Sequence, residues 1–205
     1  MDRHAARTVR LTVRVRRALA RAYWRVSRWQ HVSTVRPGSG GGVLVGAPHT
    51  SNWDFVLMLA IAWDLGLSVR YLGKAALFRP PFGWVMRALG GIPVDRSNPG
   101  GLVADLVARA RAGEDFYLVV TPEGTRSAGE YWKSGFWRIA VGAELPVTLG
   151  FVDRATMTTG LGLTFTPTGD VREDMDTVRA FYADKSGLRP ERRTVPRLRE
   201  EDQAS

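Results

Sequence analysis

The sequence predicts a single α/β domain: a mixed, mostly parallel sheet flanked by helices and preceded by a basic amphipathic helix. Short apolar runs alternate with helical patterns through residues 43–186, an order typical of parallel strands. A chain of 205 residues, 44% of them hydrophobic, can fill one substantial core. Charge is concentrated at one end, because residues 1–30 hold nine Arg and one Asp, or +8 of the formal +9.

Residues 1–35 are predicted to form the basic helix. At about 100° per residue, its arginines and its apolar residues separate into two stripes. The basic stripe comprises Arg3, Arg7, Arg10, Arg14, Arg17, Arg21, Arg25 and Arg28. The apolar stripe comprises Leu11, Val15, Leu19, Ala22, Val26 and Trp29. A helix of this kind is typical of elements that lie on anionic membrane surfaces.

Two alternatives remain for this helix. Its apolar stripe can instead pack on the protein's own domain, with the arginines in solvent. Arginine-rich helices also suit nucleic-acid phosphates, but the basic charge is confined to residues 1–30 and no nucleic-acid-reading motif accompanies it. We therefore expect an anionic membrane surface, and no nucleic acid, as the partner.

The rest of the chain divides into three parts. RPGSGGG at 36–42 has the composition of a flexible linker. The folded domain is expected at 43–186, and the polar, proline-punctuated stretch 187–205 is expected to hang loosely as a tail. Strands are predicted at 43–48, 69–73, 92–96, 116–121, 146–152 and 163–167. Helices are predicted at 52–65, 80–89, 102–112, 134–143 and 173–184.

Composition excludes several kinds of chemistry. The chain has no cysteine, and His49 is the only histidine outside the basic arm, so a thiolate nucleophile is excluded and a zinc site is disfavoured. No metal is expected. The sequence contains no P-loop, no G-x-S-x-G elbow and no dinucleotide fingerprint. The longest apolar run, at 55–63, is too short to cross a bilayer, and residues 1–30 lack the apolar core of a secretory signal.

HTSNWD at 49–54 is the strongest candidate for catalysis. It follows a predicted strand directly and opens a predicted helix, which would let the carboxylate of Asp54 reach back to the imidazole of His49. A histidine backed by a carboxylate is a general base whose tautomer is fixed. Spacing alone leaves another interpretation open, since Ser51 and Asp54 also have the form of a capping box at the start of a helix.

Further candidates follow other strands. In TPEGTRS at 121–127, Glu123 supplies a carboxylate, Arg126 can bind a phosphate, and backbone N–H groups near Gly124 and Thr125 can form an anion-binding nest. GKAALFRPPFG at 73–83 and GGIPVDR at 90–96 add basic residues after two more strands. The basic candidates at strand ends are Lys74, Arg79, Arg96 and Arg126. Collected at one edge of a sheet, they would form a phosphate pocket, although each is also compatible with an ordinary solvated turn.

Taken together, these blocks resemble the glycerolipid acyltransferases, the family of 1-acyl-sn-glycerol-3-phosphate acyltransferase. HTSNWD is similar to the first block of the family, GKAALFRPPFG and GGIPVDR to the second, TPEGTRS to the third and ELPVTLGFVD at 144–153 to the fourth. The resemblance covers roughly residues 43–153. Two positions depart from the family pattern: Pro48 stands where many members have Asn, and Thr121 replaces the usual aromatic residue before Pro-Glu-Gly.

The resemblance implies transfer of a fatty acyl group from acyl-CoA or acyl carrier protein to a lysophospholipid hydroxyl, first of all that of 1-acyl-sn-glycerol-3-phosphate. It implies His49 and Asp54 as the catalytic pair and no cofactor beyond the acyl co-substrate. Residues implied to bind substrate are Lys74, Arg79, Arg96, Glu123, Gly124, Thr125 and Arg126. A peripheral, monotopic place on the cytoplasmic face of the membrane is expected. The alternatives are another lipid or glycolipid acceptor, or a non-catalytic lipid-binding protein.

Overall fold

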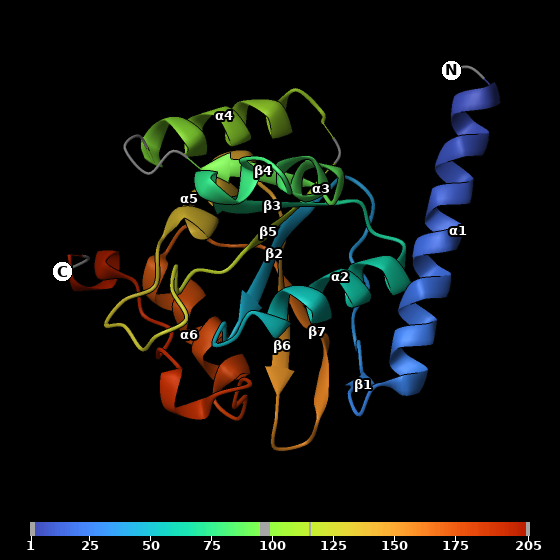
Figure 1. Cartoon of the computed structure of the whole chain (residues 1–205). Coiled ribbons are helices and arrows are strands. Elements are labelled where there is room, and N and C mark those ends of the chain that lie inside the picture. The colour runs from blue at the N-terminus through green and yellow to red at the C-terminus, as the bar shows by residue number, and fades with distance from the viewer. Residues whose placement is uncertain (1–2, 95–98, 115, 204–205) are drawn as a thin grey trace.

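The computed structural model describes residues 3–94, 99–114 and 116–203. Its elements alternate between strands and helices, as the sequence predicts, and Figure 1 shows their arrangement. The helices are α1 (Arg3–Val26), α2 (Trp53–Leu65), η1 (Ala75–Phe78), α3 (Gly83–Ala88), α4 (Pro99–Arg111), α5 (Gly135–Ala143), α6 (Val171–Tyr182), η2 (Pro190–Arg192) and η3 (Arg199–Asp202). The strands are β1 (Gln30–His31), β2 (Gly42–Ala47), β3 (Val69–Lys74), β4 (Gly91–Val94), β5 (Tyr117–Val120), β6 (Val147–Asp153) and β7 (Thr158–Phe165).

The strands form one seven-stranded sheet in the order β1-β7-β6-β2-β5-β3-β4. All neighbouring strands pair in parallel except β6 and β7, which are antiparallel. This confirms the predicted mixed, mostly parallel sheet. β2 lies at the centre between β6 and β5, so the residues that follow β2 emerge at the middle of the carboxyl edge, where active sites of such sheets gather.

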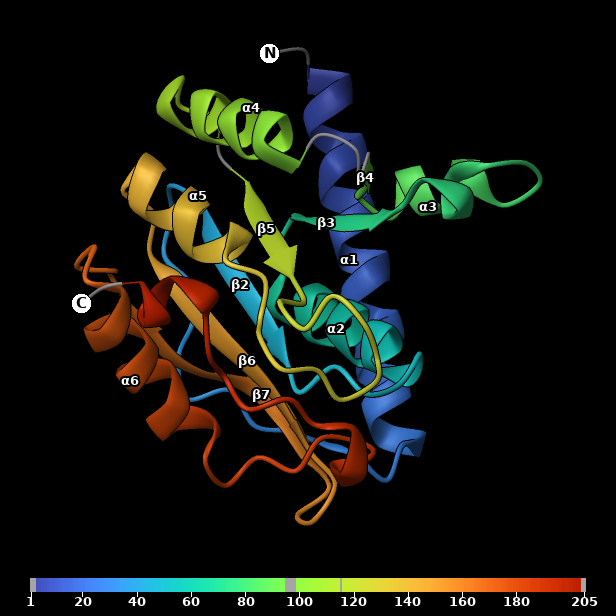
Figure 2. The ribbon, with the colours of Figure 1, turned by 90° about the vertical axis from the view of Figure 1, so that its left-hand side faces the viewer.

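Two apolar layers cover the sheet, and the alternation along β2 shows how they form. Val43, Val45 and Ala47 face the larger cluster, which α4, α5 and α6 complete, whereas Leu44 faces the smaller cluster beneath α2 and α3. Figure 2 shows the two groups of helices on opposite sides of the sheet. Both faces are buried, which explains why the strands read as nearly continuous apolar runs.

Helix α1 packs on α2, but not through its apolar stripe. Ala20 is 1% exposed and Trp24 stacks on His31, with ring centroids 5.3 Å apart. By contrast Leu19 is 54% and Val26 85% exposed. The alternative in which the apolar stripe packs on the domain is therefore wrong for these two residues, which are open to solvent, whereas Ala20 on another face of the helix is buried. No described helix combines the length and apolarity needed to cross a membrane.

Four local predictions need adjustment. The helix predicted over 1–35 ends at Val26, and Gln30 and His31 form the edge strand β1. The linker predicted at 36–42 ends early, because Gly41 is buried beside Phe116 and Gly42 already belongs to β2. The helix predicted at 80–89 is the short α3, with the 3-10 turn η1 before it. The strand predicted at 163–167 begins five residues earlier, because the β6–β7 pairing extends back to Thr158.

The prediction of a loose tail at 187–205 is wrong for the described residues 187–203, here called the C-terminal segment. Leu198 is fully buried in the larger cluster, and its strand-like bridge to Trp132 includes a 2.8 Å hydrogen bond from Trp132 N to Arg197 O. Gly187 N donates to Val152 O at 2.9 Å. Leu198 fills a core position, and Thr194 and Glu201 are buried as well, so this segment is packed on the domain.

Candidate active site

His49 lies two residues beyond the end of β2, at the centre of the sheet's carboxyl edge. The strand before it is almost entirely buried, which fixes the position of the loop that carries the imidazole. The side chain itself is 20% exposed, so a ligand can reach it from solvent. The sequence prediction of a strand-end histidine at this edge agrees with the structure.

Asp54 occupies the first turn of α2 and is 9% exposed. Its Oδ2 atom accepts hydrogen bonds from Thr50 N and Ser51 N, both at 2.8 Å, and lies 3.1 Å from His49 Nδ1. The imidazole contact has ion-pair distance, although its angle is not that of a well-formed hydrogen bond. The carboxylate of Asp54 faces His49 and also accepts from the backbone N–H of Ser51, which is one half of a capping box. The other half is missing, because Ser51 Oγ accepts from Trp53 N and the N-cap residue of α2 is Asn52.

Glu123 is placed differently from the prediction. It is 5% exposed, and its two carboxylate oxygens accept hydrogen bonds from the backbone N–H groups of His49 and Thr194. Burial raises the pKa of this carboxyl group, an effect that the two backbone hydrogen bonds oppose. Since each oxygen accepts from a backbone donor, the carboxylate of Glu123 supports the loop that carries His49 in this structure.

The rest of the TPEGTRS block lies beside the His49 block (residues 49–54). Arg126 Nη1 donates to Asn52 Oδ1 at the start of α2, and its side chain is exposed. Gly124 has φ of 67°, a left-handed conformation that favours glycine and turns the loop after Glu123. Gly124 and Thr125 are both exposed. The structure thus brings the basic group of Arg126 to the same edge as His49.

The other predicted basic residues are further from His49. Tyr71 on β3 pairs with Val119 on β5, so Lys74 reaches the carboxyl edge two strands away from β2. Arg79 follows η1 beyond that edge, and both side chains are exposed. Arg96 lies outside the described residues. The structure therefore gathers Arg126 with His49, and it does not bring Lys74 or Arg79 into contact with either.

The C-terminal segment supplies contacts that sequence reasoning missed. Arg189 N donates to Thr50 Oγ1 at 3.0 Å, and Thr50 is fully buried next to His49. Thr194 N donates to Glu123 and Thr194 Oγ1 accepts from Gly129 N at 2.9 Å. All these contacts use backbone groups or threonine hydroxyls, which leave no recognisable sequence motif. The segment thus contacts both the His49 block and the loop that carries Glu123.

Within the part of the chain that the structure describes, no group of three or more His, Asp or Glu side chains is arranged to hold a metal ion. The functional groups that the structure brings together here are the imidazole of His49, the carboxylates of Asp54 and Glu123, and the guanidinium of Arg126. A partly exposed imidazole against a buried carboxylate can accept a proton from an incoming hydroxyl. A nearby exposed guanidinium can bind a phosphate on the same substrate.

Comparisons with known proteins agree with this geometry. The family model described as Acyltransferase matches residues 24–149. The chain is 36% identical over 103 residues to 1-acyl-sn-glycerol-3-phosphate acyltransferase epsilon of Mus musculus, covering 47% of this chain and 28% of that protein. It is 31% identical over 116 residues to 1-acyl-sn-glycerol-3-phosphate acyltransferase of Streptococcus pneumoniae, covering 55% and 43%. The chain thus spans less than half the length of these curated relatives.

Among solved structures, the crystal structure of the 1-acyl-sn-glycerophosphate (LPA) acyltransferase PlsC from Thermotoga maritima matches with a TM-score of 0.59. The match covers 87% of this chain and 81% of that one, at 16% sequence identity. At this identity the likeness concerns the fold alone.

Proposed function

The chain belongs to the acyltransferase family, and we propose that it transfers a fatty acyl group from a thioester donor to the hydroxyl of a lysophospholipid. The proposed acceptor is 1-acyl-sn-glycerol-3-phosphate, giving phosphatidic acid, with acyl-CoA or acyl carrier protein as donor. The observation that carries the proposal is the His49–Asp54 contact of 3.1 Å at the centre of the carboxyl edge, with Arg126 beside it. The two curated relatives, whose names state this activity, support the choice of acceptor.

His49 is the proposed general base. Nδ1 faces Asp54, which leaves Nε2 for the acceptor hydroxyl. As the hydroxyl oxygen attacks the thioester carbonyl, its proton moves to Nε2, and the carboxylate of Asp54 stabilises the imidazolium that forms. When the carbon–sulfur bond breaks, the same proton returns to the leaving thiolate. No covalent enzyme intermediate is required, because holding both substrates in line already removes much of the barrier.

Arg126 is the proposed phosphate ligand. Its guanidinium is exposed and is held near His49 by the side chain of Asn52. A phosphate is a better partner for a guanidinium than a neutral amide, because both charge and bidentate geometry favour it. An acceptor whose phosphate binds Arg126 would present its free hydroxyl toward the imidazole.

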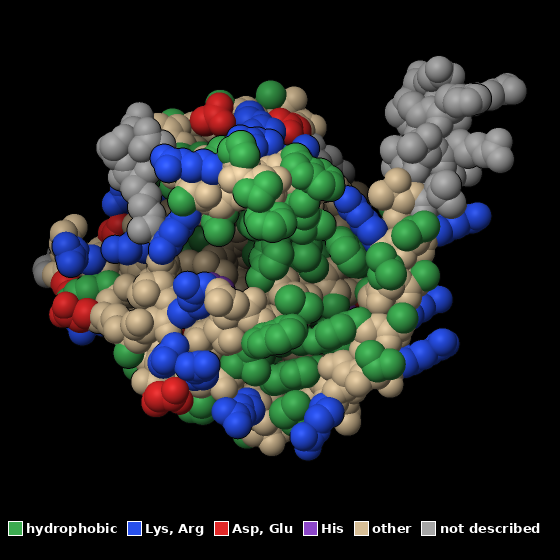
Figure 3. All heavy atoms as spheres, viewed as in Figure 1, with side chains coloured by type: hydrophobic (Ala, Val, Ile, Leu, Met, Phe, Trp, Pro, Cys, Tyr) green, Lys and Arg blue, Asp and Glu red, His purple; other side chains and the backbone are tan. Residues whose placement is uncertain are grey.

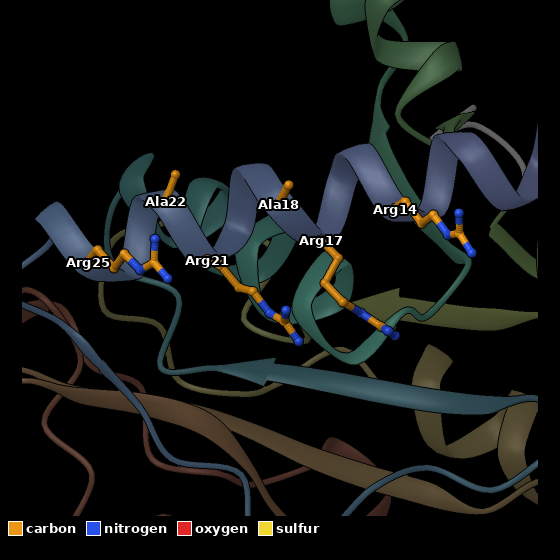
Figure 4. Close-up of a pocket in the computed structure, with 6 residues that line it drawn as sticks. All are labelled: Arg14, Arg17, Ala18, Arg21, Ala22 and Arg25. Carbon is orange, nitrogen blue, oxygen red and sulfur yellow. The ribbon is translucent and has the colours of Figure 1, made fainter.

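Association with an anionic membrane is the second part of the proposal, and α1 supports it. Arg14, Arg17, Arg21 and Arg25 project from one side of the helix and, with Ala18 and Ala22, line an open groove of about 440 Å³ (Figure 4). The exposed apolar residues Val15, Leu19 and Val26 form the adjoining stripe. A basic groove beside an exposed apolar stripe suits lipid headgroups and the acyl boundary below them.

The decisive experiment incubates the purified chain with 1-acyl-sn-glycerol-3-phosphate and radiolabelled acyl-CoA, or acyl carrier protein charged with the same acyl group, and separates the products by thin-layer chromatography. We expect labelled phosphatidic acid with at least one donor. Parallel incubations with lysolipids that lack the free phosphate, and with a glycolipid, test the other acceptors. Faster transfer to one of these would replace the proposed acceptor, and no transfer to any lipid would refute the enzymatic proposal.

A further inference from the structure

Residues 75–88, here called the aromatic finger, form a firmly built projection between β3 and β4. They comprise η1 and α3, and Phe78 anchors them, because its ring is 5% exposed and packs between Gly73 and Gly91. Arg87 closes the base: its Nη1 atom donates to Phe78 O at 3.0 Å and its guanidinium lies 5.4 Å from the centre of the Phe78 ring. The finger is therefore held by its own packing.

The tip of the finger exposes large apolar side chains. Phe82 is 70%, Trp84 72% and Leu77 50% exposed, although Phe78 in the same segment is buried. The buried ring of Phe78 holds the projection, whereas the rings of Phe82 and Trp84 are left in solvent. Exposed apolar side chains grouped in this way are typical of a surface that binds a partner. This surface is not needed for the fold, because the exposed rings contribute no core contacts.

The finger shares its face of the molecule with other exposed apolar residues. Trp53, which immediately precedes Asp54, is 66% exposed, and Leu19 on α1 is 54% exposed. Figure 3 shows hydrophobic side chains gathered over α2 and α3 and along the facing side of α1, around a hollow. The candidate active site thus opens beside a broad apolar face whose parts come from three separate helices.

The charge of these segments identifies the partner. No acidic residue occurs at 3–53 or at 65–94, the stretches that contain α1 and the finger. Lys74 and Arg79 flank η1 with exposed side chains, as the arginines of α1 flank its apolar stripe. Exposed Trp and Phe rimmed by basic residues suit the headgroup region of an anionic bilayer, where amphipathic rings partition and basic groups attract the lipid.

We propose that the aromatic finger is a second membrane contact, which inserts Phe82 and Trp84 into the interface of an anionic bilayer while α1 lies on the same surface. The inference rests on the proposed membrane association and adds a second, independent point of attachment. Two contacts fix the orientation of the domain, as one helix cannot, and hold the Trp53 side of the His49 block toward the lipid. The acceptor then reaches His49 without leaving the membrane surface.

The test compares Phe82→Ser/Trp84→Ser with wild type by flotation on vesicles of phosphatidylcholine and phosphatidylglycerol. Loss of two interfacial rings is expected to weaken binding about tenfold. Val141→Ser is the matched control, because Val141 is a partly exposed apolar residue on α5, across the sheet, and its binding should equal that of wild type. Unchanged binding by the double variant would overturn the proposal.

Fluorescence locates the contact directly. Vesicles with brominated acyl chains quench inserted tryptophans, so Trp84→Phe, which keeps an apolar ring, should bind vesicles nearly as well as wild type but lose part of the quenching. Quenching identical to that of wild type would place Trp84 outside the bilayer and contradict the proposal. Both measurements use binding alone, so they decide this inference even if no acyl transfer is detected.

Activity separates a membrane contact from a channel for the acyl chain. The double variant should lose activity toward a long-chain acceptor in vesicles while retaining wild-type activity toward a short-chain acceptor dissolved as monomers. Equal loss toward both acceptors with unchanged flotation would assign the rings to substrate binding and overturn the membrane contact.

Discussion

The His49 block and the exposed apolar surface of α1 and the aromatic finger are built in opposite ways. Asp54 and Glu123 are buried and hold the loop around His49 through backbone N–H groups, so the position of the imidazole depends on a few exact contacts. Leu19, Phe82 and Trp84 are exposed and make no such contacts. We therefore expect the loss of a single contact around His49 to impair catalysis strongly. Loss of one exposed apolar side chain should weaken binding only slightly, and several such losses should add up.

His49→Ala should give the largest effect. Removing the proposed base is expected to lower the turnover number about a hundredfold or more, because general-base catalysis alone contributes that much. The melting temperature should change little, since the side chain lies at a strand end and adds little to the core. Single-turnover acyl transfer and calorimetry measure the two quantities. Retention of a tenth or more of wild-type turnover would refute the base assignment.

Glu123→Gln tests whether the carboxylate of Glu123 fixes the position of the loop that carries His49. The amide keeps only one acceptor for two backbone donors, so His49 should shift and turnover should fall roughly tenfold or more at unchanged KM for the acceptor. Glu130→Gln, an exposed change in the same loop, is the control and should retain wild-type turnover. A rise in KM for the acceptor without loss of turnover would instead indicate that Glu123 binds substrate, as the family resemblance implies.

Glu123→Gln should also change how the free energy of unfolding depends on pH. Burial raises the pKa of Glu123 above its ordinary value of 4.5, so the folded protein holds this proton more tightly than the unfolded chain. The stability that this group contributes is fully present below pH 4.5 and is lost as the pH rises through the raised pKa. The free energy of unfolding of wild type minus that of Glu123→Gln should therefore decrease above pH 4.5, as denaturant titrations can show. An increase would contradict the burial effect.

Arg126→Ala tests the boundary between the two regions, because Arg126 is exposed but tied to the His49 block through Asn52. Loss of a charge-assisted contact to phosphate should raise KM for 1-acyl-sn-glycerol-3-phosphate about tenfold, with little change in turnover. A monoacylglycerol acceptor, which has no phosphate, should show no such change, and Arg111→Ala on α4 should leave both KM values as in wild type. Unaltered KM for the phosphorylated acceptor would remove Arg126 from the phosphate pocket.

The contrast also explains what the sequence could predict. The sheet and the helices around it follow from apolar periodicity, which reports burial on both faces, and the His49–Asp54 contact follows from a strand-to-helix turn of fixed length. The seating of the C-terminal segment could not be predicted, because it depends on Leu198 filling a core position between distant elements. The buried place of Glu123 was missed for a related reason, since its partner Thr194 lies 71 residues away.

For α1 the sequence predicted a basic and an apolar stripe but could not identify the face that packs on α2. On that face Ala20 is buried, Arg16 lies 5.8 Å from the centre of the Trp63 ring, and Arg21 pairs with Asp64 at 3.9 Å. Hydrophobicity alone ranks Leu19 above Ala20 as a packing residue. The structure reverses this order, because Ala20 is 1% exposed and Leu19 is 54% exposed.

Leu19 and Ala20 therefore provide the finest comparison, because adjacent residues belong to the two opposite kinds of surface. Leu19→Ser should weaken vesicle binding only about fivefold, since one partly inserted apolar side chain is lost, and the melting temperature should stay unchanged. Ala20→Leu should lower the free energy of unfolding by about 1–3 kcal/mol, because the added methyl groups meet a filled interface. Flotation and denaturant titration of both variants measure all four outcomes. The opposite outcome is that Leu19→Ser lowers the free energy of unfolding and leaves vesicle binding unchanged. In that case the apolar stripe of α1 stabilises the fold, and the proposed role of α1 in membrane binding is refuted for Leu19.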